Sequence, residues 1–449
     1  MFLFGGSNRA GFLVFCSALL FGCASSPAMR AAEEGRFADL RKAIDEDLRS
    51  AELNADQARE LARLVVAAEI QHAQGAVGVE RVEMLAPCAK EMEDALSKRT
   101  KKSDEVGAEA ARLLIERELV DADDMRLVAE QAELSAQNAD AVVAWKAVHT
   151  RLLWNPLDGA ERRRRMLDGD EDVRAAALRA AVDAGDGVDI DLLLEASRVD
   201  PHPLARTMAI RALGAIGGER VVLGLKDVWM MADEPRRQVI TTAWATSRSI
   251  ELGGRRELWW AAETQSGTLS IAAAIALVRA KDARADAAIA ILARAIESGS
   301  TQSRVYAINV SPLNAGLVSK AIAKAQDDSD EAVALAAISR RVESSGEGSA
   351  KSGTQEREAL IAKLVRMAGF EGSIGQRARA SLARARVRDI LPALERDVES
   401  KDMNIRKAAG QNLAAMGELS RASVLLSDGE PLVRTQVGCA ILSAPETAD

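Results

Sequence analysis

The sequence predicts an all-α protein, an α-solenoid of stacked antiparallel helix pairs. The first observation is composition: six Trp, seven Phe and one Tyr in 449 residues are fewer aromatic residues than β-sandwiches or β-barrels use. The second is spacing, because apolar residues recur three or four positions apart with charged residues between them, which is the helical period. The third is a recurrence of related segments about 30 residues apart, which is typical of solenoids.

Hydrophobicity and charge exclude two classes of protein. With 48% hydrophobic residues, the chain is too apolar to be wholly disordered. Its 59 basic and 67 acidic side chains leave a net charge of −8, so no overall positive field would hold a nucleic-acid backbone. We therefore expect no nucleic acid among its partners.

Residues 1–22 have the pattern of a signal peptide. Arg9 precedes an apolar stretch, residues 10–21, which suits a signal-peptide core and is shorter than the roughly 20 residues that span a bilayer. The stretch ends in Leu-Phe-Gly-Cys at residues 20–23, which resembles the bacterial lipobox. The resemblance implies cleavage before Cys23 and diacylation of its thiol, which would anchor the protein to a membrane. An ordinary secretory signal with an incidental Cys is the alternative.

The residues after Cys23 bear on localisation. In the best-known sorting rule for such lipoproteins, an Asp close behind the Cys retains the protein in the inner membrane, and here Ala24 and Ser25 follow. We therefore expect a lipid anchor in the outer membrane facing the periplasm, rather than in the inner membrane. The segment 23–36 is short, polar and without a helical pattern. We therefore expect a lipidated Cys23 followed by a flexible tether.

Amphipathic helices are predicted throughout residues 37–160. Apolar residues on one face of each segment would pack against neighbouring helices, and Asn155-Pro156 ends the run. We expect these helices to stack as degenerate pairs onto the same solenoid as the rest of the chain. The periodicity places helices at residues 37–48, 61–68, 82–96, 108–119, 125–134 and 139–153.

Beyond residue 160 the chain repeats a pattern in which an Asp precedes an Arg by six positions. Degenerate copies fall between the clear ones, and we divide the region into repeats at 161–343 and 358–449. A Gly/Ser-rich loop or hinge at 344–357 separates them. The clear copies are Asp168 with Arg174, Asp200 with Arg206, and Asp428 with Arg434; the frame also fits Arg237 and Arg406, and degenerate copies lie at 268–276, 303–308, 330–338 and 376–383.

This pattern resembles HEAT repeats, in the short bacterial form also called phycobilisome-lyase HEAT-like repeats. In that form a turn reading Asp-Pro-x-x-x-Val-Arg opens the first helix of each pair, and residues 200–206 are the closest match. The resemblance covers about 161–445 and implies a stack of helix pairs with a continuous core. Asp and Arg side chains of adjacent turns could then form a hydrogen-bonded ladder along the solenoid.

Two Cys remain in the folded part, Cys88 and Cys439. They lie near opposite ends of the chain, and an elongated solenoid would hold them far beyond the roughly 7 Å between Cα atoms that a disulfide tolerates. We therefore predict no disulfide and interpret both as small buried apolar residues.

Residues with catalytic or metal-binding potential are scattered. His72, His149 and His202 stand apart from one another and from any Cys, which disfavours a metal site. No nucleophile elbow, dinucleotide-binding turn or Walker loop occurs. The acidic run at residues 168–172 resembles the start of a calcium loop, but Val173 occupies the sixth position, where the loop needs Gly. We expect no cofactor, no metal and no enzymatic activity.

Two groups of residues are candidates for binding a protein partner. Trp259 and Trp260 are adjacent, so on a helix they point about 100° apart and are harder to bury together; they either pack between repeats or anchor a partner. Arg162 and Arg163 begin a run of four Arg at 162–165. The run either binds an anionic partner or lipid headgroup, or forms a solvated face that pairs with the acidic turn at 168–172.

The function we favour is a lipid-anchored, non-catalytic scaffold that holds other proteins at the cell envelope. Its partners are unidentified proteins, and its contact with the membrane runs through Cys23. A chromophore lyase is one alternative, because related repeats occur in such enzymes, although an exported lipoprotein would not meet their cytoplasmic partners. A structural spacer without a stable partner is the other.

Overall fold

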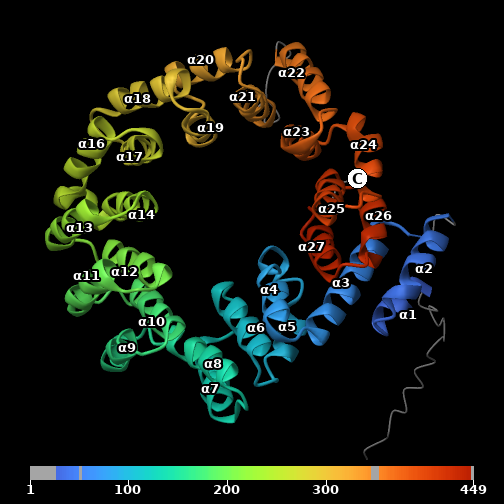
Figure 1. Ribbon diagram of the computed structural model, residues 1–449, viewed down its shortest axis with the longest axis horizontal. Coiled ribbons are helices and arrows are strands. Elements are labelled where there is room, and N and C mark those ends of the chain that lie inside the picture. Colours follow the sequence, from blue (N-terminus) through green and yellow to red (C-terminus); the bar gives the residue numbers. More distant parts are fainter. Residues whose placement is uncertain (1–26, 50–52, 345–352, 446–449) are drawn as a thin grey trace, which may run out of the picture.

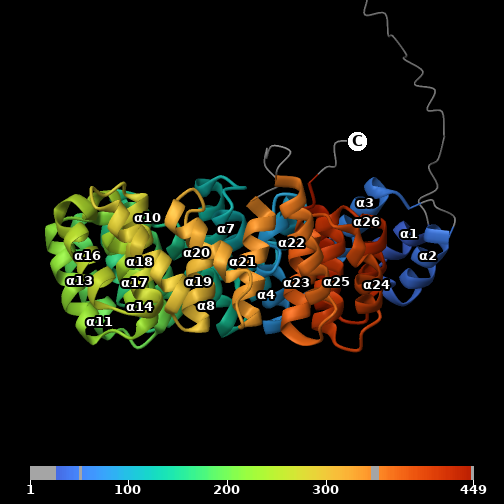
Figure 2. The same ribbon diagram turned by 90° about the horizontal axis from the view of Figure 1, so that it is seen from above.

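The computed structural model describes residues 27–49, 53–344 and 353–445, and every regular element in these ranges is a helix. The helices form two rows, an inner and an outer one, that close into a ring (Figure 1). Seen from above, the ring is a band in which helices stand side by side (Figure 2). The predicted all-α solenoid is confirmed, and its closure into a ring is a feature that the sequence did not predict.

The inner row surrounds the centre of the ring, and each of its helices contacts the next. Its members are α4 Gly75–Glu83, α6 Glu105–Glu116, α8 Ala139–Arg151, α10 Glu171–Ala184, α12 Pro203–Ile216, α14 Glu234–Trp244, α17 Gly267–Arg279, α19 Thr301–Val310, α21 Glu331–Ser344, α23 Gly372–Arg384, α25 Met403–Met416 and α27 Pro431–Leu442.

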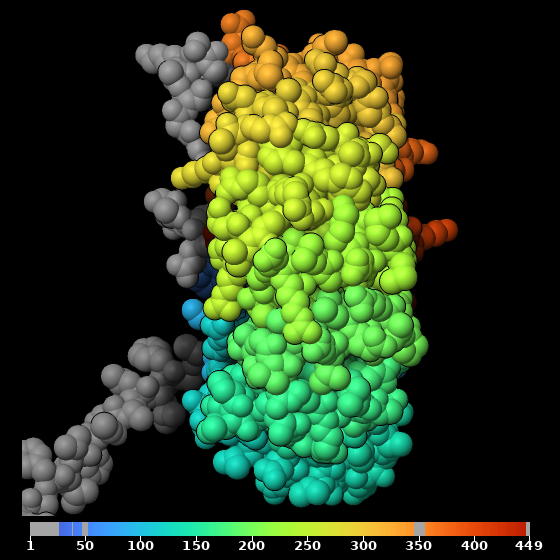
Figure 3. Space-filling model, turned by 90° about the vertical axis from the view of Figure 1, so that its left-hand side faces the viewer, coloured from blue at the N-terminus to red at the C-terminus, as the bar shows by residue number. Residues whose placement is uncertain are grey.

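The outer row packs behind the inner one, and the chain alternates between the two rows. On the side that Figure 3 shows, the surface follows chain order, from teal through green and yellow to orange. The members of the outer row are α5 Glu93–Arg99, α7 Ala122–Ser135, α9 Gly159–Met166, α11 Ile190–Val199, α13 Glu219–Met231, α16 Arg255–Thr264, α18 Ala285–Ser298, α20 Gly316–Ala325, α22 Gly353–Ala368, α24 Leu391–Val398 and α26 Leu419–Ala422.

Short helical turns join some of the helices of the two rows, and three helices precede the two rows in the described part of the chain. The turns are η1 Ala86–Cys88, η2 Pro156–Asp158, η3 Gly187–Asp189, α15 Ser247–Ser249, the π-helical η4 Ile250–Gly254, η5 Arg388–Ile390 and η6 Ser423–Ser427; the first helices are α1 Pro27–Glu33, α2 Phe37–Arg49 and α3 Ala55–His72.

The core consists of small and branched aliphatic side chains, which lets neighbouring helices approach closely. At Gly214 of α12, for example, a Cβ atom would lie 2.8 Å from the Cβ atom of Ala243 on α14. One buried cluster lies within residues 166–337, and the other combines residues 28–152 with residues 335–442. The two ends of the chain therefore share one hydrophobic core.

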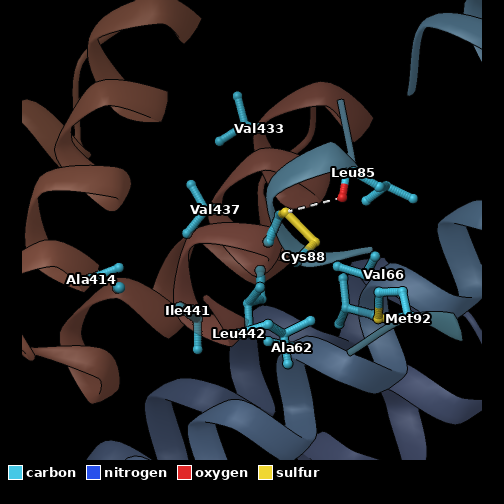
Figure 4. Packing of buried hydrophobic residues seen from close by; sticks show 14 of the residues in the cluster. Ala62, Val66, Leu85, Cys88, Met92, Ala414, Val433, Val437, Ile441 and Leu442 are labelled. Carbon is cyan, nitrogen blue, oxygen red and sulfur yellow. Dashed lines mark hydrogen bonds between the residues drawn. A yellow bond between two sulfur atoms is a disulfide. The ribbon is translucent and has the colours of Figure 1, made fainter. Parts of the chain in front are cut away.

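The ring closes where α27 packs against α3 and η1, a contact that we call the seam. Ala62 and Val66 of α3 belong to one buried cluster with Ile441 and Leu442 of α27, and Leu442 lies beside Ala62 (Figure 4). A disulfide joins Cys88 and Cys439 across 351 positions of sequence, with their Cα atoms 5.3 Å apart. Our prediction of two distant free thiols is wrong, because the solenoid curves back on itself and brings its ends together.

Polar contacts reinforce the seam. Arg434 of α27 donates from Nε to Glu69 Oε1 of α3 at 2.7 Å, and both residues are buried. Arg81 of α4 donates to the other oxygen of Glu69 at 2.8 Å. The buried carboxylate therefore has a cation on each side, as a charge removed from water requires.

The N-terminal helices differ from the prediction in two places. The single helix expected at 82–96 is broken into α4, η1 and α5, because Pro87 cannot donate a backbone hydrogen bond within a helix. The tether expected at 23–36 contains helix α1, whose Ala28, Ala31 and Ala32 are buried against α2 and α3. The remaining predicted helices of the region correspond to α2, α3, α6, α7 and α8.

Several predictions fall on residues outside the described ranges. These are the signal peptide at 1–22, the lipidated Cys23 and most of the loop predicted at 344–357, of which residues 353–357 belong to α22. No helix in the described part of the chain is long and apolar enough to cross a membrane.

Candidate partner-binding surface

The Asp and Arg side chains of the repeats lie at the turns that lead into inner helices. Arg174 of α10 donates from Nε and Nη2 to the two carboxylate oxygens of Asp200, at 2.9 and 3.1 Å. Asp200 also accepts from the backbone N–H of His202 at 2.9 Å, so one carboxylate caps its own turn and holds the preceding repeat. Arg406 and Asp428 form the same two hydrogen bonds, at 2.6 and 2.9 Å. We call each such Arg–carboxylate pair between repeats a rung.

Other predicted ladder residues take different partners. Asp168 pairs with Lys146 Nζ of α8 at 2.7 Å. Arg206 donates to the backbone carbonyls of Asp200 and Pro201 and to no carboxylate, because Asp233, in the next turn, caps α14 and pairs with Arg236. Arg434 forms its rung with Glu69 across the seam, as described above.

Hydrogen bonding sets the ionisation of the ladder carboxylates. Burial raises the pKa of Asp200, but the hydrogen bonds from Arg174 and from His202 N–H outweigh it and leave the pKa below its usual range. The pKa of Asp428 is lowered in the same way, with Arg406 and Glu430 N–H as donors opposing burial. These carboxylates are charged structural groups, which suits a ladder.

A further rung escaped the sequence analysis because the register of a degenerate copy was set two residues too late. Arg304 of α19 pairs with Asp328 through both of its terminal nitrogens, and Asp328 accepts from Asp330 N–H at 3.0 Å. Asp328 is therefore the counterpart of Asp200, and the copy assigned to 330–338 begins at that Asp. The spacing of six positions fails there, since Ala334 stands where Arg would be.

The run of four Arg is a structural cluster. Arg162 is completely buried and contacts Asp186 and Asp189, the latter at 2.9 Å, and Arg163 pairs with Asp189 at 3.0 Å. A partner cannot reach Arg162, so that candidate binding role is wrong. The alternative pairing with the turn at 168–172 is also wrong for these two side chains, because the turn at 186–189 supplies their acids.

The other two Arg of the run pair with an acid of their own helix, and Arg165 also lies 3.7 Å from Glu133 Oε1 of α7. Arg164 and Arg165 of α9 both pair with Glu161. The hydrogen bond from Arg164, followed by that from Arg165, lowers the pKa of Glu161 to about 2. The run therefore leaves no unpaired cationic patch on the described surface.

The tryptophans pack mainly between repeats. Trp229 stacks on Trp244 with ring centroids 5.1 Å apart, and Trp260 meets the edge of Trp229 at 5.7 Å. Trp259 is buried and donates from Nε1 to Asp282 at 3.2 Å. Trp260 is only half-buried, and Lys226 Nζ lies 2.8 Å from its ring centroid. The core interpretation accounts for Trp259, while Trp260 keeps an accessible edge.

Histidines and acids do not assemble into a metal centre in the described ranges. No group of three or more His, Cys, Asp or Glu there could hold a metal ion. His149 Nδ1 lies 3.1 Å from Glu133 Oε2, and His202 lies 3.9 Å from Glu171, both in pairs within the stack.

Two cavities of the inner row were not foreseen from the sequence. A cavity of about 620 Å³ lies between α14, α17 and α19, and a second of about 390 Å³ lies beside it over α10 and α12. Thr246 and Ser247 line both, so the two cavities adjoin at this connection and together reach five successive inner helices; we call the pair the inner groove. Its residues come from separate repeats, and the one sequence signal was the irregular connection between Trp244 and Arg255.

One comparison with known proteins, the match to a family model, agrees with the repeat assignment. Residues 161–245 match the family model described as HEAT repeats, and no curated protein matches the chain in sequence. Among solved structures, a mutant of the karyopherin Kap121p aligns with TM-score 0.39 and 13% identity over 91% of this chain and 52% of that one. The same karyopherin bound to the extreme C-terminus of a protein phosphatase aligns with TM-score 0.40 and 13% identity, over 92% and 53%.

A third solved structure, an engineered protein, aligns with TM-score 0.23 and 17% identity over 87% of this chain and 96% of that one. The present chain spans about half the length of the karyopherin chains.

Proposed function

This chain is a HEAT-repeat protein, and we propose that it acts as a lipid-anchored, non-catalytic scaffold that holds other proteins at the bacterial cell envelope. Cys23 is the anchor, and the outer membrane facing the periplasm is its location. The observation that carries the proposal is the unbroken ring of stacked repeats, since a solenoid offers an extended, continuous surface to its partners.

The seam disulfide supports the proposed compartment. Disulfides persist in oxidising environments such as the bacterial periplasm and are rare in the cytosol. The bond between Cys88 and Cys439 lies in the core that joins both ends of the chain, where it is part of the folded architecture. An exported protein would acquire this bond during folding, which agrees with the signal peptide inferred from residues 1–22.

The proposal is tested by crosslinking in membranes of the native host and identifying what co-purifies with the intact protein and with the Cys23→Ala variant. Cys16→Ala is the matched control, because cleavage before Cys23 would remove residue 16. We expect lipid on the intact protein and on the Cys16→Ala variant, and a protein partner enriched with both. Loss of the anchor should deplete that partner.

Three outcomes contradict the proposal. Recovery of unlipidated Cys23 in the processed protein removes the anchor. A lipidated protein that enriches no partner favours a structural spacer. A chromophore transferred covalently to another protein favours a lyase.

A further inference from the structure

One wall of the inner groove comes from the connection between α14 and α16. The connection between α12 and α13 consists of residues 217–218, whereas residues 245–254, between α14 and α16, form α15 and a π-helical turn. Thr246, Ser247 and Arg248 of this insertion line the groove. The insertion is a local addition to the regular solenoid, and it enlarges the inner face at one place.

Glycines fix the insertion against its neighbours. Gly217 has a φ of +68°, and a Cβ atom there would lie 2.3 Å from Arg248 Cβ. At Gly254 a Cβ atom would lie 2.3 Å from the carbonyl oxygen of Trp244. Both positions therefore require glycine, so the wall is held in place by close backbone packing.

The groove combines apolar and hydroxyl-bearing side chains. Ile250, Ile275 and Val310 supply aliphatic surface, and Thr242 and Ser247 supply hydroxyl groups at exposed positions. Helices pack about 8–10 Å apart, so the four spacings between five helices make the inner groove about 32–40 Å long. This length and this mixture suit an extended chain, which presents side chains and backbone polar groups in alternation.

One guanidinium in the groove has no partner among the described residues. Arg279 of α17 is exposed and takes part in no hydrogen bond or ion pair there. Two other Arg of this region do have acidic partners: Arg255 pairs with Asp282 at 2.8 Å, and Arg284 pairs with Glu263 at 2.6 Å. Tyr306, the only tyrosine of the chain, lines the same cavity without a hydrogen bond from its hydroxyl to any described residue.

We propose that the inner groove binds an extended, acidic peptide segment of a partner protein. An aliphatic side chain of the peptide packs on Ile275 and Val310, and an adjacent carboxylate pairs with Arg279 and accepts from the Tyr306 hydroxyl. The argument is charge complementarity, since Arg279 is a cation that the ring itself leaves unpaired. The inference rests on the proposed scaffold function and names the chemistry of the partner segment.

The test uses a phage-displayed library of random dodecapeptides, selected on the full-length oxidised protein. Selected sequences are synthesised with a fluorophore, and their affinities are measured by anisotropy. We expect acidic peptides with a branched aliphatic residue beside the acid. Arg279→Ala should weaken their binding at least tenfold, while Arg294→Ala, which removes an exposed and unpaired Arg from outer helix α18, should leave it unchanged.

A second pair of variants tests the shape of the groove and leaves its charge unchanged. Thr242 is exposed, so Thr242→Trp fills the groove without disturbing the core, and it should abolish binding. Ala287→Trp, at an exposed position of α18, is its control. Labelling with 3-fluorotyrosine places a single fluorine at Tyr306, whose ¹⁹F resonance should shift when peptide binds, and this reports the site independently of affinity.

Certain results overturn the inference. They are selected peptides that are basic, peptides that bind equally to the Thr242→Trp variant, or a ¹⁹F resonance that does not move at saturation. Displacement of every selected peptide by a fatty-acid probe that itself requires Arg279 would assign the groove to a small amphiphile. If envelope partners still co-purify with the Thr242→Trp variant, the groove inference fails while the scaffold proposal stands. If no envelope partner co-purifies with the intact protein, the scaffold proposal fails.

Discussion

An ordinary repeat boundary and the ring seam use the same arginine in different surroundings. Between α10 and α12, Arg174 donates to Asp200, which lies 26 positions further along the chain. At the seam, Arg434 donates to Glu69, which lies 365 positions away on a helix outside the repeats. In both cases the guanidinium also binds the carbonyl of its own turn, Asp168 or Asp428. The last repeat thus forms its rung with the N-terminal region in place of a further repeat.

The two boundaries differ in burial and in covalent connection. The side chains of Arg174 and Asp200 are 13% and 7% exposed, against 8% and 3% for Arg434 and Glu69. The seam alone has a disulfide, between η1 and α27. The ring therefore closes through the same kind of interface that joins two repeats. At the seam, the ion pair is less exposed to water and a disulfide is added. Changes at the seam should therefore cost more than the same changes at an ordinary boundary.

The largest effect should follow from removing the disulfide. The double variant Cys88→Ala and Cys439→Ala loses a bond that restricts a long loop in the unfolded chain, which corresponds to about 2–5 kcal/mol of stability. Hydrogen exchange should accelerate first in α3 and α27 and hardly at all in α10 and α12. Equal exchange rates in the seam of the variant and of the oxidised protein would show that the bond does not maintain closure.

The next effect should come from the seam ion pair. Arg434→Met leaves the buried Glu69 with Arg81 as its only cation, and we expect a loss of about 3 kcal/mol, measured by denaturant unfolding. Arg434→Met combined with Glu69→Gln should cost less than the sum of the two single changes, because they remove one interaction. Strict additivity would contradict the pairing.

A smaller effect is expected at the ordinary boundary. Arg174→Met removes the two hydrogen bonds to Asp200 and those to the carbonyls of Asp168 and Gly169, all at a site that water partly reaches, so the loss should be about 1.5 kcal/mol. Asp200 still accepts from His202 N–H in this variant, which limits the damage. A loss equal to that of Arg434→Met would remove the distinction drawn between the two boundaries.

The smallest effect should be on the pH dependence of stability. The pKa of Asp328 is lowered, by Arg304 first and then by Asp330 N–H, as the pKa values of Asp200 and Asp428 are lowered by their own donors. A carboxyl with a lowered pKa stabilises the fold fully above its unfolded value of about 3.9 and loses that stabilisation as pH falls through the folded value.

Unfolding measured between pH 7 and pH 2.5 checks this sign. The difference in stability between the natural chain and the Asp328→Asn variant should be constant down to about pH 4 and shrink below it. A difference that grows as pH falls would reverse the sign and contradict the ionised rung.

Local patterns made much of the fold predictable from the sequence. The spacing of Asp200 and Arg206 identifies a repeat turn, and the rung at that turn depends on residues of adjacent repeats. The register failed at Asp328, because Ala334 replaces the Arg that marks the other copies. Helix α1 was missed because a short helix that buries only alanines has no amphipathic pattern of large residues.

Closure and the inner groove could not be predicted in the same way. Small rotations between successive repeats add up around the solenoid. The sequence of any one segment does not determine whether the total rotation brings Cys439 next to Cys88. The groove depends on Thr242, Arg279 and Tyr306, which belong to three different helices. Arg162 shows the reverse error, since a run of Arg suggested an exposed patch, whereas the structure buries this first member against the acids of the turn at 186–189.

The central claim, that the solenoid closes into a ring, is tested most directly at the seam cysteines. The full-length protein is purified from membranes without reductant, its free thiols are alkylated, and a digest is mapped by mass spectrometry before and after reduction. The account predicts that Cys88 and Cys439 are recovered in one disulfide-linked pair of peptides. Recovery of both as alkylated thiols, even after treatment with a mild oxidant, would contradict a structure that holds their Cα atoms 5.3 Å apart.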